Sequence, residues 1–120
     1  MLPSADELLA AWPFIARRYG LAQLPSRPAV DAALRLAQEH ATGPEDAPAA
    51  LFFALASYPR AFPGAWALAS RLFASGLAAS LGFRLDATED ELSTLRLEIA
   101  QRRADCEAVK AWFRVRLAPV

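Results

Sequence analysis

Few side chains of this sequence could act in catalysis or hold an anion, and they lie far apart. His40 is the only histidine, and imidazole is the side chain whose ordinary pKa suits acid–base catalysis near neutrality. Tyr58 would be a poor substitute, because a phenol with a pKa of about 10 is a weak base at neutral pH. Arg60 and Arg71 could bind an anion, pair with an acid or cap helix carbonyls. We favour the structural role, since a lone arginine provides a binding contact and no mechanism.

Gly64 and Trp66 are further candidates, because a helix is expected to begin beside them. Amides at a helix N-terminus attract anions. Trp66 could stack on a ligand, but it suits a filler of the pocket or a core residue better, as do Trp12 and Trp112. We expect no metal and no cofactor.

Cys106, the only cysteine, cannot form an internal disulfide. A catalytic thiol is one interpretation. However, Asp105 and Glu107 flank Cys106, and neighbouring acids raise the pKa of a thiol. The sequence therefore favours an inert cysteine on a helix, in a reducing compartment.

Composition predicts a single domain, residues 1–120, with a substantial core, because 55% of the 120 residues are hydrophobic. The 13 basic and 13 acidic residues cancel, so no nucleic acid partner is indicated. Ala61–Phe83 is the one stretch that invites a membrane interpretation. Arg71 near its middle argues for a buried helix in a protein with no membrane partner. The N-terminus lacks the pattern of a signal peptide, and we expect a cytoplasmic protein.

The positions of these residues depend on helices, and the sequence predicts an all-α fold. The chain is organised around Ala49–Phe83, two apolar runs joined by an exposed corner at Tyr58–Gly64. Apolar spacing, capping residues and glycine stops predict a compact bundle of five to six helices with a buried central helix. The expected helices lie near residues 5–19, 28–41, 48–58, 65–81, 89–102 and 105–117. Phe83–Ala87 is expected to be an extended connector with little β-structure.

Several local features specify where helices begin. Two capping boxes, in which a hydroxyl residue is followed three positions later by glutamate, are formed by Ser4 with Glu7 and Thr88 with Glu91. Pro13 interrupts the first helix, so we expect a kink there or a later start. Asp46 is placed to cap the third helix.

Burial follows from the near absence of charge in the third and fourth helices. The residues expected to be deeply buried are Phe52, Leu55, Leu68, Leu72 and Leu77. On this basis Leu72→Ala would destabilise the protein by about 2–5 kcal/mol.

Gly82–Leu92, which runs from glycine through Phe-Arg-Leu to an acidic helix start, resembles the segment after the central helix of Doc-type proteins. Ser4–Gly20, Pro28–Leu34 and Leu51–Leu55 resemble earlier segments of the same Fic/Doc family in the same order. The resemblance covers nearly the whole chain. It implies a Fic/Doc-like helical fold and an ancestry in nucleotide or phosphate transfer.

The active loop of that family has no counterpart at Tyr58–Ala67. The family uses a histidine as base, an acid that helps to hold Mg²⁺, and Gly, Asn, Lys and Arg residues around the phosphates. With Gly64 on the family glycine, the histidine and acid positions hold proline, and Asn, Lys and Arg are replaced by Ala65, Trp66 and Ala67. One inserted residue would put Tyr58 at the histidine position.

The leading hypothesis is therefore a degenerate Fic/Doc-fold protein without transferase activity that acts by binding another protein. The alternative is an active phosphoryl or nucleotidyl transferase that uses ATP and Mg²⁺ with displaced residues, His40 or Tyr58 with Arg60 and Arg71. A third hypothesis is a binder of small apolar ligands. The partner and the oligomeric state stay open.

Overall fold

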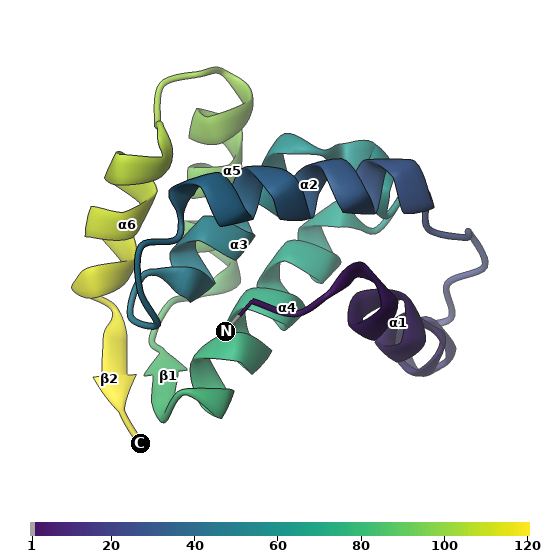
Figure 1. Ribbon diagram of the computed structural model, residues 1–120, viewed down its shortest axis with the longest axis horizontal. Coiled ribbons are helices and arrows are strands. Elements are labelled where there is room, and N and C mark those ends of the chain that lie inside the picture. Colours follow the sequence, from purple (N-terminus) through teal and green to yellow (C-terminus); the bar gives the residue numbers. More distant parts are fainter. Residues whose placement is uncertain (1) are drawn as a thin grey trace.

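Six helices and a small two-stranded sheet make up the fold within residues 2–120, the part of the chain that the computed structural model describes (Figure 1). The elements, in chain order, are α1 (Ala5–Tyr19), α2 (Arg27–His40), α3 (Ala47–Ser57), the 3-10 turn η1 (Pro59–Ala61), α4 (Trp66–Ser80), β1 (Phe83–Leu85), α5 (Glu89–Ala100), α6 (Cys106–Arg114) and β2 (Leu117–Pro119). The all-α class and the bundle of five to six helices are confirmed.

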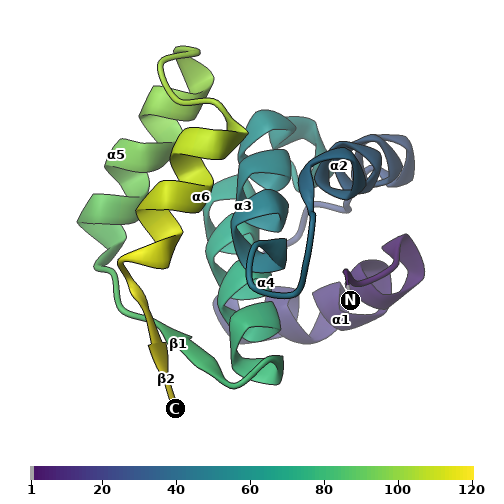
Figure 2. The same cartoon turned by 60° about the vertical axis from the view of Figure 1, so that its left-hand side comes forward.

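Helix α3 is the buried central helix, and it is apolar on every side. In Figure 2 it lies between α2 on one side and the pair α5 and α6 on the other. Leu51, Ala54 and Leu55 pack with α1, α2 and the start of α4, whereas Phe52 and Ala56 pack with α5 and α6. Two hydrophobic clusters therefore meet on one helix, which explains why α3 has no polar face.

Helix α4 is less buried than the sequence predicted. Leu68, Leu72 and Leu77 are only half-buried, so their expected deep burial is wrong. The residues that α4 does bury are small ones: Ala69, Ser70, Ala74 and Ala78. Small side chains let α4 approach α3 closely, and this places its leucines on the flanks of the contact.

Local starting signals act as predicted at two helices. Ser4 and Thr88 form complete capping boxes with Glu7 and Glu91. Helix α1 begins at Ala5 and continues through Pro13, so the later start considered from the sequence is wrong. Pro13 is exposed, and α1 continues beyond it to Tyr19.

Strands β1 and β2 are antiparallel, with Arg84 opposite Ala118. The expected minor β-structure after α4 is confirmed, and its partner is residues 117–119, of which only Leu117 lay within the predicted helix 105–117. Helix α6 stops at Arg114, and residues 117–119 pair with β1 instead. The backbone amide of Val120 donates to the carbonyl of Gly82, and the amide of Asp86 donates to that of Arg116, which fastens both ends of the ribbon.

The apolar stretch Ala61–Phe83 is divided among the end of η1, a short loop, α4 and the first residue of β1. Among residues 2–120, no helix has the length and apolar character needed to span a membrane.

Candidate functional site

The loop before α4, where the resemblance places an active site, borders a hollow of about 290 Å³. The residues around it are Trp12, Gly20, Leu21, Ala22, Gln23, Pro63, Gly64 and Ala65. None of them is an acid, a base or a cation, and the only polar side chains are the Gln23 amide and the Trp12 indole. The indole NH is buried without a hydrogen-bond partner, so it does not reach the open part of the hollow. This hollow can offer contacts, but no general base and no charge to stabilise a transferring phosphate.

The glycine at position 64 is explained by the conformation of the backbone, without any contact to a ligand. It adopts a left-handed conformation with φ of 73°. A Cβ atom at this position would overlap the side-chain oxygen of Gln23. Gln23, which the sequence analysis did not single out, therefore fills the space in front of α4.

We expect Gly64→Ala to destabilise the protein by about 1–2 kcal/mol, chiefly because an L-residue is strained at positive φ. The Gln23 oxygen ends a flexible side chain and can move, so it adds little. Urea unfolding measures the loss, and Gly76→Ala is the control. Gly76 lies within α4 with open space around it, so alanine there should be neutral or stabilise the protein by up to about 1 kcal/mol. Equal effects at the two glycines would contradict a conformational role for Gly64.

His40 and Trp66 lie outside this hollow. His40 ends α2 and packs edge-on against the ring of Phe53, with 5.6 Å between the ring centres. Trp66, the first residue of α4, is half-buried against the cluster of α3, α5 and α6, and it does not fill the space in front of Gly64. The structure thus brings neither His40 nor Trp66 to the hollow, and the aromatic residue that lines it is Trp12.

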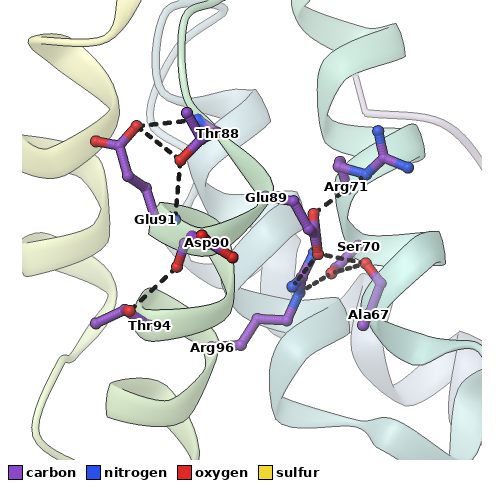
Figure 3. A network of polar contacts seen from close by, with 9 residues as sticks. All are labelled: Ala67, Ser70, Arg71, Thr88, Glu89, Asp90, Glu91, Thr94 and Arg96. Carbon is purple, nitrogen blue, oxygen red and sulfur yellow. Dashed lines mark hydrogen bonds and ion pairs between the residues drawn. The ribbon is translucent and has the colours of Figure 1, made fainter.

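Arg71 takes part in an ion-pair network between α4 and α5 (Figure 3). Its Nε lies 3.3 Å from a carboxylate oxygen of Glu89. The other Glu89 oxygen lies 2.7 Å from Arg96, which is buried and also donates to Ser70 Oγ and to the Ala67 carbonyl. These contacts engage Arg71 in joining two helices, where it shares the carboxylate of Glu89 with Arg96.

Tyr58 and Arg60 are brought together in a different place, a cavity of about 500 Å³ between η1 and the first turn of α2. We call it the Arg60 cavity. Its lining residues are Ser26, Pro28, Ala29, Ser57, Tyr58, Pro59 and Arg60. Arg60 is exposed and makes no ion pair with any residue in the range 2–120. Of the sequence candidates, only these two share a cavity.

Asp46 was expected to cap α3, and this is wrong. Its carboxylate makes no capping hydrogen bond; it accepts from the Thr42 hydroxyl and lies 3.5 Å from the ammonium of Lys110 on α6. Both members of this pair are buried, with side chains 7% and 3% exposed. Burial raises the pKa of the Asp46 carboxyl, but Thr42 and Lys110 together outweigh it and bring that pKa below its ordinary value. Lys110 is the only lysine of the chain, a signal that could have marked it as structural.

Cys106 is buried on α6, one turn before Lys110. Burial is the main reason that the pKa of its thiol is raised to about 11, and the neighbouring acids Glu107, Asp105 and Asp46 raise it further against the opposing charge of Lys110. The thiol is protonated at neutral pH, so the structure supports the inert cysteine that the sequence favoured.

An apolar groove of about 420 Å³ separates the start of α1 from α4. Its walls are Leu2, Pro3, Glu7, Leu8 and Ala11 on one side and Leu72, Phe73, Gly76, Leu77 and Ser80 on the other. Leu72 and Leu77, which the sequence assigned to the core, therefore line a surface groove. Glu7 is the only charged residue among them.

None of the family models and none of the curated proteins compared with this chain matches it. Among residues 2–120, no three His, Cys, Asp or Glu side chains are grouped so that they could hold a metal ion. The relation to the Fic/Doc family therefore stays a prediction from the sequence segments.

Proposed function

We propose that this protein is a degenerate Fic/Doc-like helical protein that has lost transferase activity and acts by binding another protein. The observation that carries the loss of activity is the lining of the hollow before α4. It has no base, no carboxylate and no cation, and its front is occupied by Gln23. Phosphoryl transfer depends almost entirely on positioning and on charge stabilisation, which this lining does not provide.

The dispersal of the remaining candidates supports the same proposal. His40 packs on Phe53, Arg71 pairs with Glu89, and Tyr58 lies with Arg60 in a separate cavity. Displaced catalytic residues would have to converge on one reacting atom within hydrogen-bond distance. The alternative transferase has only the phenol and guanidinium of the Arg60 cavity as a possible centre, without a metal ligand beside them.

The groove between α1 and α4 supports a binding role. An apolar segment of a partner would pack here with its side chains between Leu72 and Leu77, over the open position of Gly76. A basic residue on that partner would pair with Glu7 at the edge. Half-buried leucines in a groove are typical of a surface that becomes buried on association.

Incubation of the purified protein with ATP, Mg²⁺ and elongation factor Tu, the target that the resemblance to Doc-type toxins implies, should give no modification of either protein. The measurement is intact-protein mass spectrometry for an added phosphate or nucleotide. Loss of one preorganised electrostatic group lowers a rate by a factor of about 10²–10³, and here the base, metal ligand and cations are all missing. Substituting Ala65→Asn, Trp66→Lys and Ala67→Arg together should not restore activity, since a base would still be lacking. Mg²⁺-dependent modification that Tyr58→Phe or His40→Ala abolishes would refute the proposal and establish the transferase.

A further inference from the structure

The Arg60 cavity is a preformed hollow at the corner between α2, α3 and η1. Its volume of about 500 Å³ lies within the range of about 300–1,000 Å³ that is usual for sites of small molecules. The backbone amide of Ser26 donates to the carbonyl of Ala61 at 3.0 Å, which fixes the start of α2 against η1. This bond holds the backbone on two sides of the cavity together.

The charge of the cavity is positive. Arg60 is its only charged lining residue, and no acid lines it. Of the acids beside the first turn of α2, Asp6 pairs with Arg27 at 2.6 Å and Asp31 lies 4.0 Å from the same guanidinium, and neither carboxylate lines the cavity. By contrast, the cavity that includes Arg102 also includes Asp105, and Arg96 beside α4 is paired with Glu89.

Neutral donors and apolar surface surround this cation. The hydroxyl of Ser26 makes no capping hydrogen bond, and Tyr58 adds a phenol. Ser57 is a weaker candidate, because its hydroxyl already donates to the Phe53 carbonyl. Pro28, Ala29 and Pro59 provide apolar walls. The positive end of the α2 dipole adds to the field of Arg60, but the guanidinium carries the main charge.

We propose that the Arg60 cavity binds a small organic anion, a phosphate or carboxylate group joined to an apolar body of about the size of one ring. The oxyanion accepts hydrogen bonds from the guanidinium of Arg60 and from the Ser26 hydroxyl, while the ring lies against Ala29 and the two prolines. Charge-assisted hydrogen bonds to a planar guanidinium suit both kinds of oxyanion. This site is separate from the hollow before α4, and the proposal does not depend on the loss of transferase activity.

Titration with phenyl phosphate, followed by ¹H–¹⁵N NMR, tests the site. Amide shifts should concentrate at residues 26–29 and 57–61, apart from Pro28 and Pro59, which have no amide proton. Inorganic phosphate and benzyl alcohol, which offer the anion or the ring alone, should each bind at least about tenfold more weakly, and benzoate distinguishes a carboxylate from a phosphate site. Arg60→Gln should lower the affinity for phenyl phosphate about tenfold or more. Because Arg60 is exposed and unpaired, this variant should fold normally.

A second variant changes the charge of the cavity and leaves Arg60 in place. Ala29→Glu places a carboxylate beside Arg60, in the first turn of α2, where the helix dipole favours an acid. It should abolish binding of phenyl phosphate. Arg35→Gln, which removes an exposed arginine farther along α2, is the control for net charge and should leave binding unchanged. Shifts centred outside the cavity, or equal affinities in the Arg60→Gln and Arg35→Gln variants, would overturn the proposal.

Discussion

Asp46→Asn should destabilise the protein by about 3 kcal/mol at neutral pH, because it leaves the buried ammonium of Lys110 without its buried carboxylate. The asparagine keeps the size of the side chain and can still accept from Thr42, so the loss reports the charge. Equilibrium unfolding in urea gives the difference. Combining Asp46→Asn with Lys110→Met should recover most of it, since an apolar side chain then replaces the stranded charge.

Glu107→Gln is the matched control. Glu107 lies at the same distance of 3.5 Å from the Lys110 ammonium, but its side chain is 74% exposed. Exposed partners contribute little, so this variant should lose less than about 1 kcal/mol. If the two substitutions cost the same, burial of Asp46 would not matter and the ion-pair interpretation would be wrong.

The same pair predicts a pH dependence. The folded-state pKa of Asp46 is lowered below the ordinary 3.8, so its stabilising contribution is complete above that value and is lost as the pH falls through the lower folded-state pKa. The gap in unfolding free energy between the unmodified protein and Asp46→Asn should therefore narrow as the pH falls below about 3.8. Urea unfolding at several acidic pH values measures it, and a gap that widens on acidification would contradict the direction of the shift.

Phe52→Ala should cost about 3–5 kcal/mol of unfolding free energy, the second large effect expected. Phe52 is fully buried on α3, with its ring 5.5 Å from that of Phe113 and 5.6 Å from the guanidinium carbon of Arg96. Its removal would leave a cavity where α3, α5 and α6 meet. Thermal and urea unfolding should both show the loss.

Two substitutions set the scale for this result. Phe14→Ala removes the same atoms from a side chain that is 73% exposed, and it should change stability by less than about 0.5 kcal/mol. Leu72→Ala, for which the sequence alone predicted about 2–5 kcal/mol, should now cost about 1 kcal/mol, because Leu72 is half-buried and lines the groove. A Leu72 effect as large as that of Phe52 would mean that α4 is buried as the sequence suggested.

Local physics made the helices predictable. In the capping boxes at Ser4 and Thr88, backbone amides are satisfied by side chains three residues away. Both partners therefore lie close together in the sequence, and the interaction can be predicted from it. The burial of α3 was likewise predictable, because a segment apolar on every side belongs inside a core.

Burial within α4 was not predictable from hydrophobicity. Leucines and alanines both count as apolar, and only the close approach to α3 decided that Ala69 and Ala74 face the core while Leu72 and Leu77 face the groove. The end of α6 was missed for a similar reason. Leu117 suits a helix by its spacing. In the structure it pairs instead with Leu85, 32 residues earlier in the chain, in the antiparallel sheet.

The sequence by itself determined that this is an all-α chain with a buried central helix, and that its loop before α4 lacks catalytic side chains, because these properties depend on residue type and on short-range spacing. Only the tertiary structure decided which charged groups form ion pairs. Asp46 pairs with Lys110 and does not cap a helix, and Arg71 pairs with Glu89. Arg60 lies beside Tyr58 and forms no ion pair within residues 2–120. Electrostatic partners separated by tens of residues are set by how helices pack, and the printed sequence does not contain those distances.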